Sequence, residues 1–269
     1  EWHLMRKENE VRPTLNLGPK TADFYYDPGT GSYIQPYALA VISYTEGHPA
    51  AFVMYGAILG KWRSDENLRR ALGGLASDEI AGRRAGSRKS VFAQGAIYWS
   101  AQSGAFPVLG RMNIDFDLLG EGVSPIGLPI ADAENVAGGK MQRFQSGRMY
   151  LQNGRPKAFE VHGAILAKYD AAGGLGRFGF PISDETDVRR GTAVIGKVSE
   201  FESASIYWSP QTPAAVIYGA IRERYRGRPG DTGEGGPQGD LGFPTSDESD
   251  IPGAPGARFN SFQNGSILW

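Results

Sequence analysis

The chain has 269 residues, of which 41% are hydrophobic and 21% are charged, an ordinary balance for a globular protein long enough to bury a sizeable core. The net charge of -1 argues against a nucleic-acid partner, because binding through phosphates requires a basic face. The lack of cysteine excludes disulfides, thiol catalysis and cysteine-ligated zinc, and no apolar run approaches the roughly 20 residues that insertion into a membrane requires.

Short helices are the first elements that recur along the chain. Each begins at a glycine and carries an apolar residue and an aromatic residue four positions apart, which places both on one face of a helix. A weaker helix is expected over roughly residues 2–10, where Leu4, Met5 and Val11 supply the apolar surface. The four clear pairs are Ile58/Trp62, Met112/Phe116, Ile165/Tyr169 and Ile221/Tyr225, which follow Gly56, Gly110, Gly163 and Gly219.

A turn motif is the second recurring element, and its clearest copy reads Leu-Gly-Phe-Pro-Thr-Ser-Asp-Glu over residues 241–248. Glycine admits backbone angles closed to other residues, proline fixes one dihedral, and serine or aspartate can bond nearby amides, so this stretch predicts a turn. The copies begin at residues 17, 72, 126, 178 and 241, which are 55, 54, 52 and 63 residues apart.

An aromatic β-strand is the third element and follows each turn. Its copies begin at Phe92, Phe144, Phe201 and Phe262, with a weak copy at Tyr37, and a β-prone run such as Ile-Tyr-Trp ends it. After a short link the chain is expected to return as a second strand, over residues 104–108, 157–161 and 213–217. Each repeat is therefore predicted to be a short helix plus a β-hairpin.

The repeats predict one domain over residues 1–269, with repeats at approximately 1–54, 55–108, 109–161, 162–217 and 218–269. One repeat cannot cover its own apolar face, so neighbours bury it jointly. Neither end looks like a polar cap, and the last copy stops at Trp269, before its return strand. We therefore expect an α+β repeat ring of about five repeats, propeller-like and closed with pseudo-five-fold symmetry.

Residues 241–248, Gly-Ala-Ile-Tyr-Trp-Ser at 95–100 and Tyr-Gly-Ala-Ile at 55–58 and 218–221 resemble the LGFP repeat family, and the resemblance covers nearly the whole chain. It implies a secreted, cell-wall-associated protein of mycolic-acid-bearing actinobacteria. It also implies anchoring to cell-wall polysaccharide, with arabinogalactan as the expected partner. A mycoloyltransferase or peptidoglycan amidase domain, covalently attached outside this chain, is the second partner that the resemblance implies. The pattern departs at Gly74-Leu75, Pro19-Lys20 and Leu151, where we expect degenerate sites.

Candidate carbohydrate-binding residues come from the aromatic strands and the turns. Aromatic side chains could stack on sugar rings, but neighbours in a strand point to opposite faces, so at most one of each Tyr-Trp pair serves a given surface. The turn carboxylates could accept hydrogen bonds from sugar hydroxyls or bind a cation, or the aspartates could serve as turn or helix caps, as Asp78 also could. The candidates are Tyr98, Trp99, Tyr207, Trp208, Trp269, Glu79, Asp184, Glu185, Asp247 and Glu248.

Nothing in the sequence selects catalytic residues, a metal site or a cofactor. His3, His48 and His162 are not equivalent in the repeat, and neither a Gly-x-Ser-x-Gly elbow nor a His-Glu-x-x-His motif occurs. We expect a non-catalytic, multivalent polysaccharide-binding module. The alternatives are a protein-interaction scaffold and, less favoured, a hydrolase of cell-wall glycan with a carboxylate pair.

Overall fold

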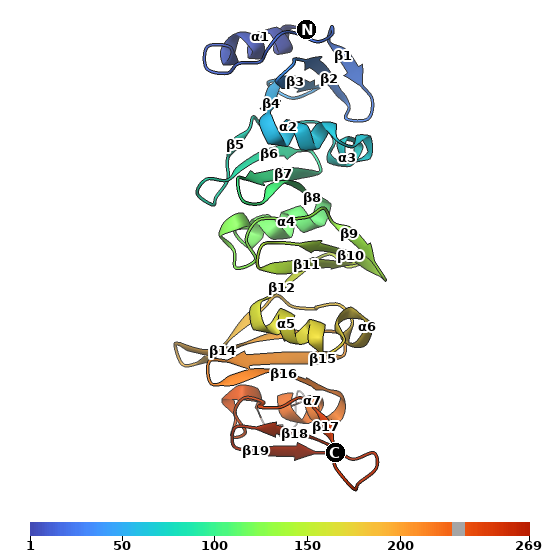
Figure 1. Cartoon of the computed structure of the whole chain (residues 1–269), viewed down its shortest axis with the longest axis vertical. Helices are drawn as coiled ribbons and strands as arrows, with labels where there is room; N and C mark the ends of the chain where they lie inside the picture. The colour runs from blue at the N-terminus through green and yellow to red at the C-terminus, as the bar shows by residue number, and fades with distance from the viewer. Residues whose placement is uncertain (228–234) are drawn as a thin grey trace. The chain divides into compact units, whose positions relative to one another are not determined.

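The computed structural model describes residues 1–227 and 235–269. The chain forms two compact units, residues 1–145 with 153–158, and residues 146–152 with 159–269. In both units, short helices alternate with small antiparallel sheets (Figure 1). Among the described residues, no helix has the length and apolar character needed to cross a membrane.

The first unit contains two four-stranded meanders, ordered β1-β2-β3-β4 and β5-β6-β7-β8, and a further pair, β9 with β10. Its helices are α1 (Trp2–Val11), α2 (Gly56–Arg63), α3 (Glu66–Leu72) and α4 (Gly110–Leu118), with a 3-10 turn η1 (Glu121–Val123). Its strands are β1 (Tyr25–Asp27), β2 (Ser32–Pro36), β3 (Ala40–Thr45), β4 (Phe52–Tyr55), β5 (Ile80–Ala81), β6 (Arg88–Phe92), β7 (Gly95–Ser100), β8 (Gly104–Leu109), β9 (Glu134–Val136) and β10 (Gly139–Arg143).

The second unit contains the pair β11 with β12, the meander β13-β14-β15-β16 and the three-stranded sheet β17-β18-β19. Its helices are α5 (Gly163–Ala171), α6 (Gly174–Phe178) and α7 (Gly219–Arg226), with a 3-10 turn η2 (Gly236–Gln238). Its strands are β11 (Gly147–Gln152), β12 (Phe159–His162), β13 (Thr186–Arg190), β14 (Ala193–Glu200), β15 (Ala204–Ser209), β16 (Thr212–Tyr218), β17 (Ser249–Asp250), β18 (Arg258–Phe262) and β19 (Gly265–Leu268).

Helices α2, α4, α5 and α7 each begin where a strand ends. The residue at that point is a glycine with φ between 52° and 58°, the left-handed region that other residues rarely adopt. The backbone therefore turns from strand to helix within one residue. The predicted helix at the start of the chain is confirmed as α1.

The predicted apolar pairs of the helices form the core. In the first unit, α2 contacts the sheet before it and the sheet after it, and buries Ile58 and Trp62 with Phe92 and Ile97. In the second unit, α7 buries Ile221 and Tyr225, and the Tyr225 ring stacks on Phe262 at 4.6 Å between centroids. Joint burial by neighbouring repeats is what the lengths of these helices require, since helices of two to three turns are unstable alone.

The repeat is larger than a helix plus a hairpin. Two further strands precede each aromatic strand, as β5 and β6 precede β7, and short helices such as α3 and α6 precede the turns. The outermost of these strands are mostly exposed and give no alternating pattern, as in Thr186–Arg190, where only Val188 is buried, and in Ile80–Ala81, where neither residue is. Each meander is an open sheet, and neither unit forms a closed barrel in its described residues.

Candidate functional site

The aspartates of the turn motif join one sheet to the next. Asp78 Oδ1 accepts a hydrogen bond from the Val53 amide at 2.8 Å, and its Oδ2 lies 2.5 Å from Lys7 Nζ. In the second unit, Asp247 likewise binds the Val216 amide at 2.9 Å and Lys168 Nζ at 2.9 Å. The aspartate therefore ties the last strand of one sheet to the turn of the following repeat.

The strand contact is kept in one further copy and lost in another. Asp184 Oδ1 accepts a hydrogen bond from the Glu160 amide at 3.0 Å, so this candidate also holds a strand. Pro107 occupies the strand position of Val53 and has no amide hydrogen to donate. There Asp132 keeps only the lysine contact, 2.7 Å from Lys61 Nζ. These contacts favour the turn role for the candidates Asp184 and Asp247.

The glutamates of the turn motif are buried beside an arginine and a tyrosine. The Glu79 side chain is 7% exposed and hydrogen-bonds Arg88, whose Nη2 donates to Tyr55 Oη at 3.0 Å. Burial raises the pKa of Glu79, against the opposing effect of Arg88. The hydrogen bond to Glu79 raises the pKa of Arg88.

The same cluster occurs at the end of the chain. Arg258 Nε lies 2.5 Å from Glu248 Oε1, and its Nη2 donates to Tyr218 Oη at 2.9 Å. The Glu248 side chain is 6% exposed. Since the two clusters share residue types, partners and positions in the repeat, we treat them as equivalent sites.

A tryptophan completes each cluster. In the antiparallel register, Trp99 is the direct cross-strand partner of Arg88. Trp269 likewise exchanges two backbone hydrogen bonds of 2.8 Å with Arg258 and is 68% exposed. The tyrosines that precede the tryptophans belong to the core, with Tyr98 at 2% and Tyr207 at 4% exposed. Opposite orientation of neighbours in a strand thus separates the candidate pairs into a core tyrosine and a partly exposed tryptophan, and Trp99 also packs against the core.

The fourth copy presents a variant cluster. Lys197 replaces arginine as the partner of Trp208, and His162 replaces tyrosine at the end of the preceding strand. His162 Nδ1 lies 2.6 Å from Glu160 Oε2, and its Nε2 lies 3.2 Å from Glu185 Oε1. Burial lowers the pKa of His162, but the hydrogen bonds to both carboxylates outweigh burial and raise it to about 9.

A pocket of about 190 Å³ opens at this fourth copy. It is lined by His162, Glu185, Lys197 and Trp208 together with the first turn of α5, Gly163 to Ile165. The exposed surface of the pocket is almost entirely apolar, with the side chains of His162, Glu185 and Lys197 among its lining residues. Such a surface suits the apolar face of a ligand.

The first and third copies lack the cluster. In the third copy, Ala133 and Leu151 stand at the glutamate and tryptophan positions. In the first copy these positions hold Phe24 and Tyr44. The third copy therefore lacks both the tryptophan and the carboxylate, whereas the second copy, where degeneracy was also expected at Gly74-Leu75, has the complete cluster.

The sequence interpretation missed the basic residues and the tyrosines of the clusters. A usable signal exists, because Arg88, Lys197 and Arg258 each lie four residues before the phenylalanine that begins the aromatic motif. Tyr55, His162 and Tyr218 each directly precede the glycine of a helix. Among the described residues, no group of three or more histidine or carboxylate side chains could hold a metal ion.

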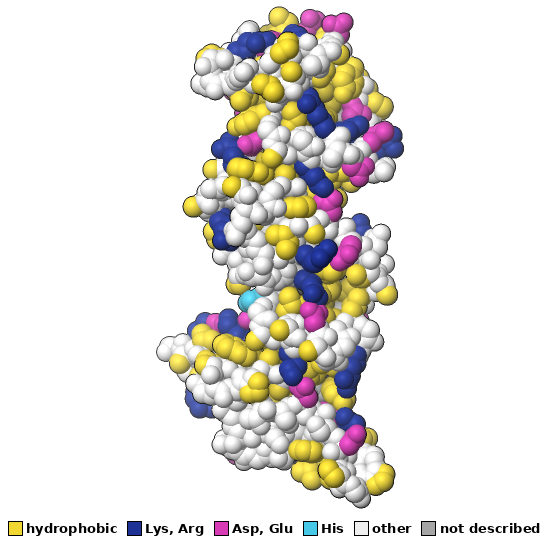
Figure 2. Space-filling view, in the orientation of Figure 1, with side chains coloured by type: hydrophobic (Ala, Val, Ile, Leu, Met, Phe, Trp, Pro, Cys, Tyr) yellow, Lys and Arg dark blue, Asp and Glu magenta, His cyan; other side chains and the backbone are white. Residues whose placement is uncertain are grey.

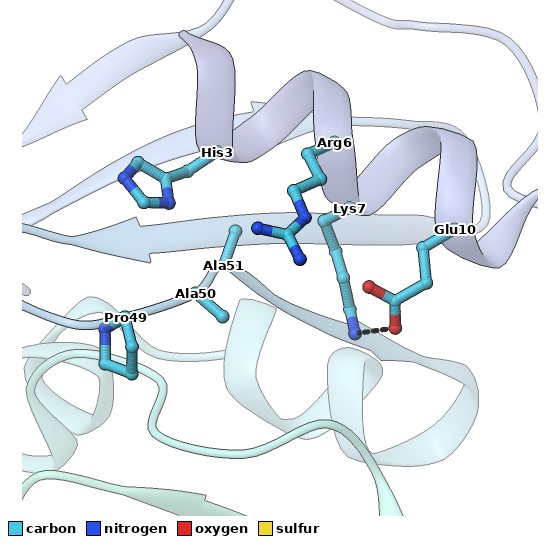
Figure 3. A pocket seen from close by; sticks show the side chains of 7 residues that line it. All are labelled: His3, Arg6, Lys7, Glu10, Pro49, Ala50 and Ala51. Atoms are coloured by element: carbon cyan, nitrogen blue, oxygen red, sulfur yellow. Dashed lines mark hydrogen bonds and ion pairs between the residues drawn. The ribbon is translucent and has the colours of Figure 1, made fainter.

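A second, smaller pocket of about 80 Å³ lies beside α1. Figure 3 shows its lining, with Lys7 joined to Glu10 and His3 and Arg6 on the same helix. The Lys7 ammonium is already bound by Glu10 and Asp78. The pocket is thus part of the connection between sheets, and we do not count it among the repeated sites.

Comparison with known proteins identifies the family to which these repeats belong. The model of a family described as LGFP repeat matches residues 72–117, 126–176, 178–233 and 241–269. No curated protein matches the chain. A solved structure of PorZ, described as an essential bacterial surface component of the type-IX secretion system of Porphyromonas gingivalis, is 11% identical over 89% of this chain and 26% of that chain. Its TM-score of 0.17 is too low to support any argument from its fold.

Proposed function

The chain belongs to the LGFP repeat family, and from this premise we propose that it is a non-catalytic module that binds cell-wall polysaccharide. The observation that carries the proposal is the recurrence of one cluster, a tryptophan at least partly exposed beside a basic residue and a buried glutamate, at Trp99, Trp208 and Trp269. An indole face can stack on the apolar face of a sugar. The charged groups beside it supply hydrogen-bond donors and acceptors for hydroxyls.

Repetition of the site suits a polymer. A single shallow site beside an indole binds weakly, but several sites on one chain convert later binding steps into intramolecular ones. Such linkage raises avidity by roughly 10²–10⁴ without any new contact. Lysines, arginines and carboxylates are interspersed on the face shown in Figure 2, which fits a neutral polymer better than a polyanion.

Within this proposal, the ligand is arabinogalactan and the protein is secreted and cell-wall associated in actinobacteria. A catalytic domain joined to the module would thereby be held at its substrate. Two observations support this. The repeats resemble those found beside cell-wall enzymes, and the charged groups of the tryptophan clusters are paired with groups of opposite sign, as Glu79 is with Arg88.

The test is a pull-down of the purified chain on delipidated cell-wall material, with arabinogalactan removed from a parallel sample. We expect binding that is lost with the arabinogalactan and weakened by Trp99→Ala and Trp208→Ala. Leu118→Ala, in an exposed side chain of α4 that is 74% accessible and outside the clusters, is the matched control. Equal absence of binding to both samples overturns the proposal and favours the protein-scaffold alternative.

Closure of the repeats into a five-fold ring stays a prediction and has its own measurement. A closed ring is flat and nearly round, and an open array of the same repeats is longer. Small-angle X-ray scattering of the monomer separates these shapes, because the open array gives the larger radius of gyration and maximum dimension.

A further inference from the structure

A row of aromatic rings crosses the first sheet and continues onto α1. Tyr26, Tyr33 and Tyr44 are direct cross-strand partners on β1, β2 and β3, so they share one face of the sheet. The Tyr26 and Tyr33 ring centroids are 5.2 Å apart. His3 stacks on Tyr44 at 4.0 Å with 7° between the ring planes, and Trp2 meets His3 edge-on at 4.9 Å.

This row occupies the register of the clusters in the other copies. Tyr33 stands where Arg88 stands, and Tyr44 stands where Trp99 stands. Phe24 replaces the buried glutamate. In the first copy, aromatic rings thus stand at the positions that hold a carboxylate and a guanidinium in the second copy.

Both ends of the row are open. Tyr26 is 52% and Trp2 is 62% exposed. The three rings between them are partly buried, with Tyr33 and Tyr44 packed against the core of the first sheet. Figure 2 shows hydrophobic side chains gathered over the part of the first unit that holds β1 and β2. Open aromatic rings at both ends of a continuous row are available to a ligand.

We propose that the row Tyr26–Tyr33–Tyr44–His3–Trp2 is a further binding surface, which takes a neutral stretch of polysaccharide by stacking on its open end rings, Tyr26 and Trp2. The inference rests on the proposed function of the tryptophan clusters. It departs from them in the chemistry of recognition, because the row has no carboxylate at the position of Glu79 and no basic residue at the position of Arg88.

The shape of the row selects the occupant. A protein partner that binds specifically covers about 800 Å² on each side and needs a broad patch. The five rings follow one another in a line with an open ring at each end, which matches a linear chain of sugar rings better than a broad protein surface. Arg6 lies 5.3 Å from the centre of the Trp2 ring at one of these ends.

The experiment measures binding of the full chain to soluble arabinogalactan by isothermal titration calorimetry. The test variant is Trp2→Ala with Tyr26→Ala, made in the wild type and in the Trp99→Ala, Trp208→Ala, Trp269→Ala background. The matched control is Tyr25→Ala, because Tyr25 precedes Tyr26 on β1, is 48% exposed and faces the opposite side. Circular dichroism confirms that each variant is folded.

We expect the triple background to retain weak binding that does not change between 50 and 500 mM salt, since no ion pair contributes to it. The row variant should abolish this residual binding and weaken wild-type binding roughly tenfold by loss of avidity, whereas Tyr25→Ala leaves both unchanged. A triple background without residual binding overturns the row while leaving the tryptophan clusters supported. Absence of binding by the wild type overturns the proposed function itself. Equal losses for Tyr25→Ala and the row variant also overturn the row.

Discussion

The Asp78 carboxylate accepts a 2.8 Å hydrogen bond from the amide of Val53, which lies on the last strand of the preceding sheet. The same carboxylate binds Lys7 of helix α1 at 2.5 Å. One side chain of the turn motif therefore holds both a strand and a helix of the repeat before it. Asp247 makes the same two contacts in the second unit, with the Val216 amide and Lys168, so the aspartate of the motif has a structural role in both units.

Asp78→Ala should lower the free energy of unfolding of the first unit by about 2–3 kcal/mol. The substitution leaves the Val53 amide without its acceptor, and it removes one of the two partners of Lys7, whose side chain is 7% exposed. Chemical denaturation followed by tryptophan fluorescence measures the loss.

Asp132→Ala is the control for this prediction within the same unit. Asp132 has a lysine partner, Lys61, but Pro107 offers no amide, and the aspartate side chain is 54% exposed. Its loss should stay below about 1 kcal/mol, the usual range for a surface ion pair. Equal effects of the two substitutions would show that the strand connection contributes nothing.

The stability of the second unit should fall as pH rises from about 6.5 to 9. His162 has a pKa raised to about 9, so its protonated form is favoured in the folded chain. The stabilisation is fully present below the unfolded pKa of about 6.5 and is lost as pH passes through 9. Its upper limit is about 3 kcal/mol, from roughly 2.5 pKa units at 1.36 kcal/mol each.

Urea unfolding at pH 6 and pH 9.5 measures this change, and His162→Gln should flatten it. Proton NMR of the imidazole provides an independent reading of the pKa. An imidazole that titrates near 6.5 would contradict the clamp formed by Glu160 and Glu185.

Substitution of Tyr98 should affect mainly the stability of the fold, whereas substitution of Trp99 should affect mainly polysaccharide binding. Tyr98 is 2% exposed and donates to Asn113 Oδ1 at 2.9 Å, so Tyr98→Ala should destabilise the fold by about 3–5 kcal/mol. Trp99→Ala, at a partly exposed position, should lower stability by about 1–2 kcal/mol and reduce polysaccharide binding. Thermal denaturation and the pull-down report the two effects. A Trp99→Ala chain that binds normally would remove Trp99 from the proposed site.

The sequence predicted the repeated helices, turns and aromatic strands because each has its own periodicity. The pair Ile58/Trp62 shows a helical face, and Tyr98-Trp99 shows a strand. It did not predict β5, β6, β13 or β14. Strands β6 and β14 pair with the aromatic strands β7 and β15, and β5 and β13 pair in turn with β6 and β14, so each is held by contacts that leave no local pattern in the sequence.

The candidate site was predicted in part. Arg88 links Glu79 to Trp99, and Arg258 links Glu248 to Trp269, while Glu185 and Trp208 line one pocket. The basic residues between them were missed, because a cross-strand partner lies about ten residues away and only the register identifies it. Adjacent residues such as Asp78 and Glu79 also differ in role through contacts with different repeats, which no local pattern reveals.

Among the described glycines of the second unit that have an ordinary backbone conformation, Gly196 should be the one at which an added side chain costs the most stability. A Cβ added there would overlap the ring of Phe243 and lie 2.5 Å from the Trp208 carbonyl oxygen. Phe243 belongs to the turn motif and is 4% exposed, so it cannot move without opening the core. Gly196→Ala should therefore destabilise the unit by about 1–3 kcal/mol.

Gly176→Ala, in helix α6 with no atom within 4 Å of the added group, should be neutral or slightly stabilising and is the control. Thermal denaturation compares the two, and Phe243→Leu should recover part of the loss only in the Gly196→Ala background. A loss that Phe243→Leu leaves unchanged would place the strain at the Trp208 backbone rather than at the packing of turn on sheet.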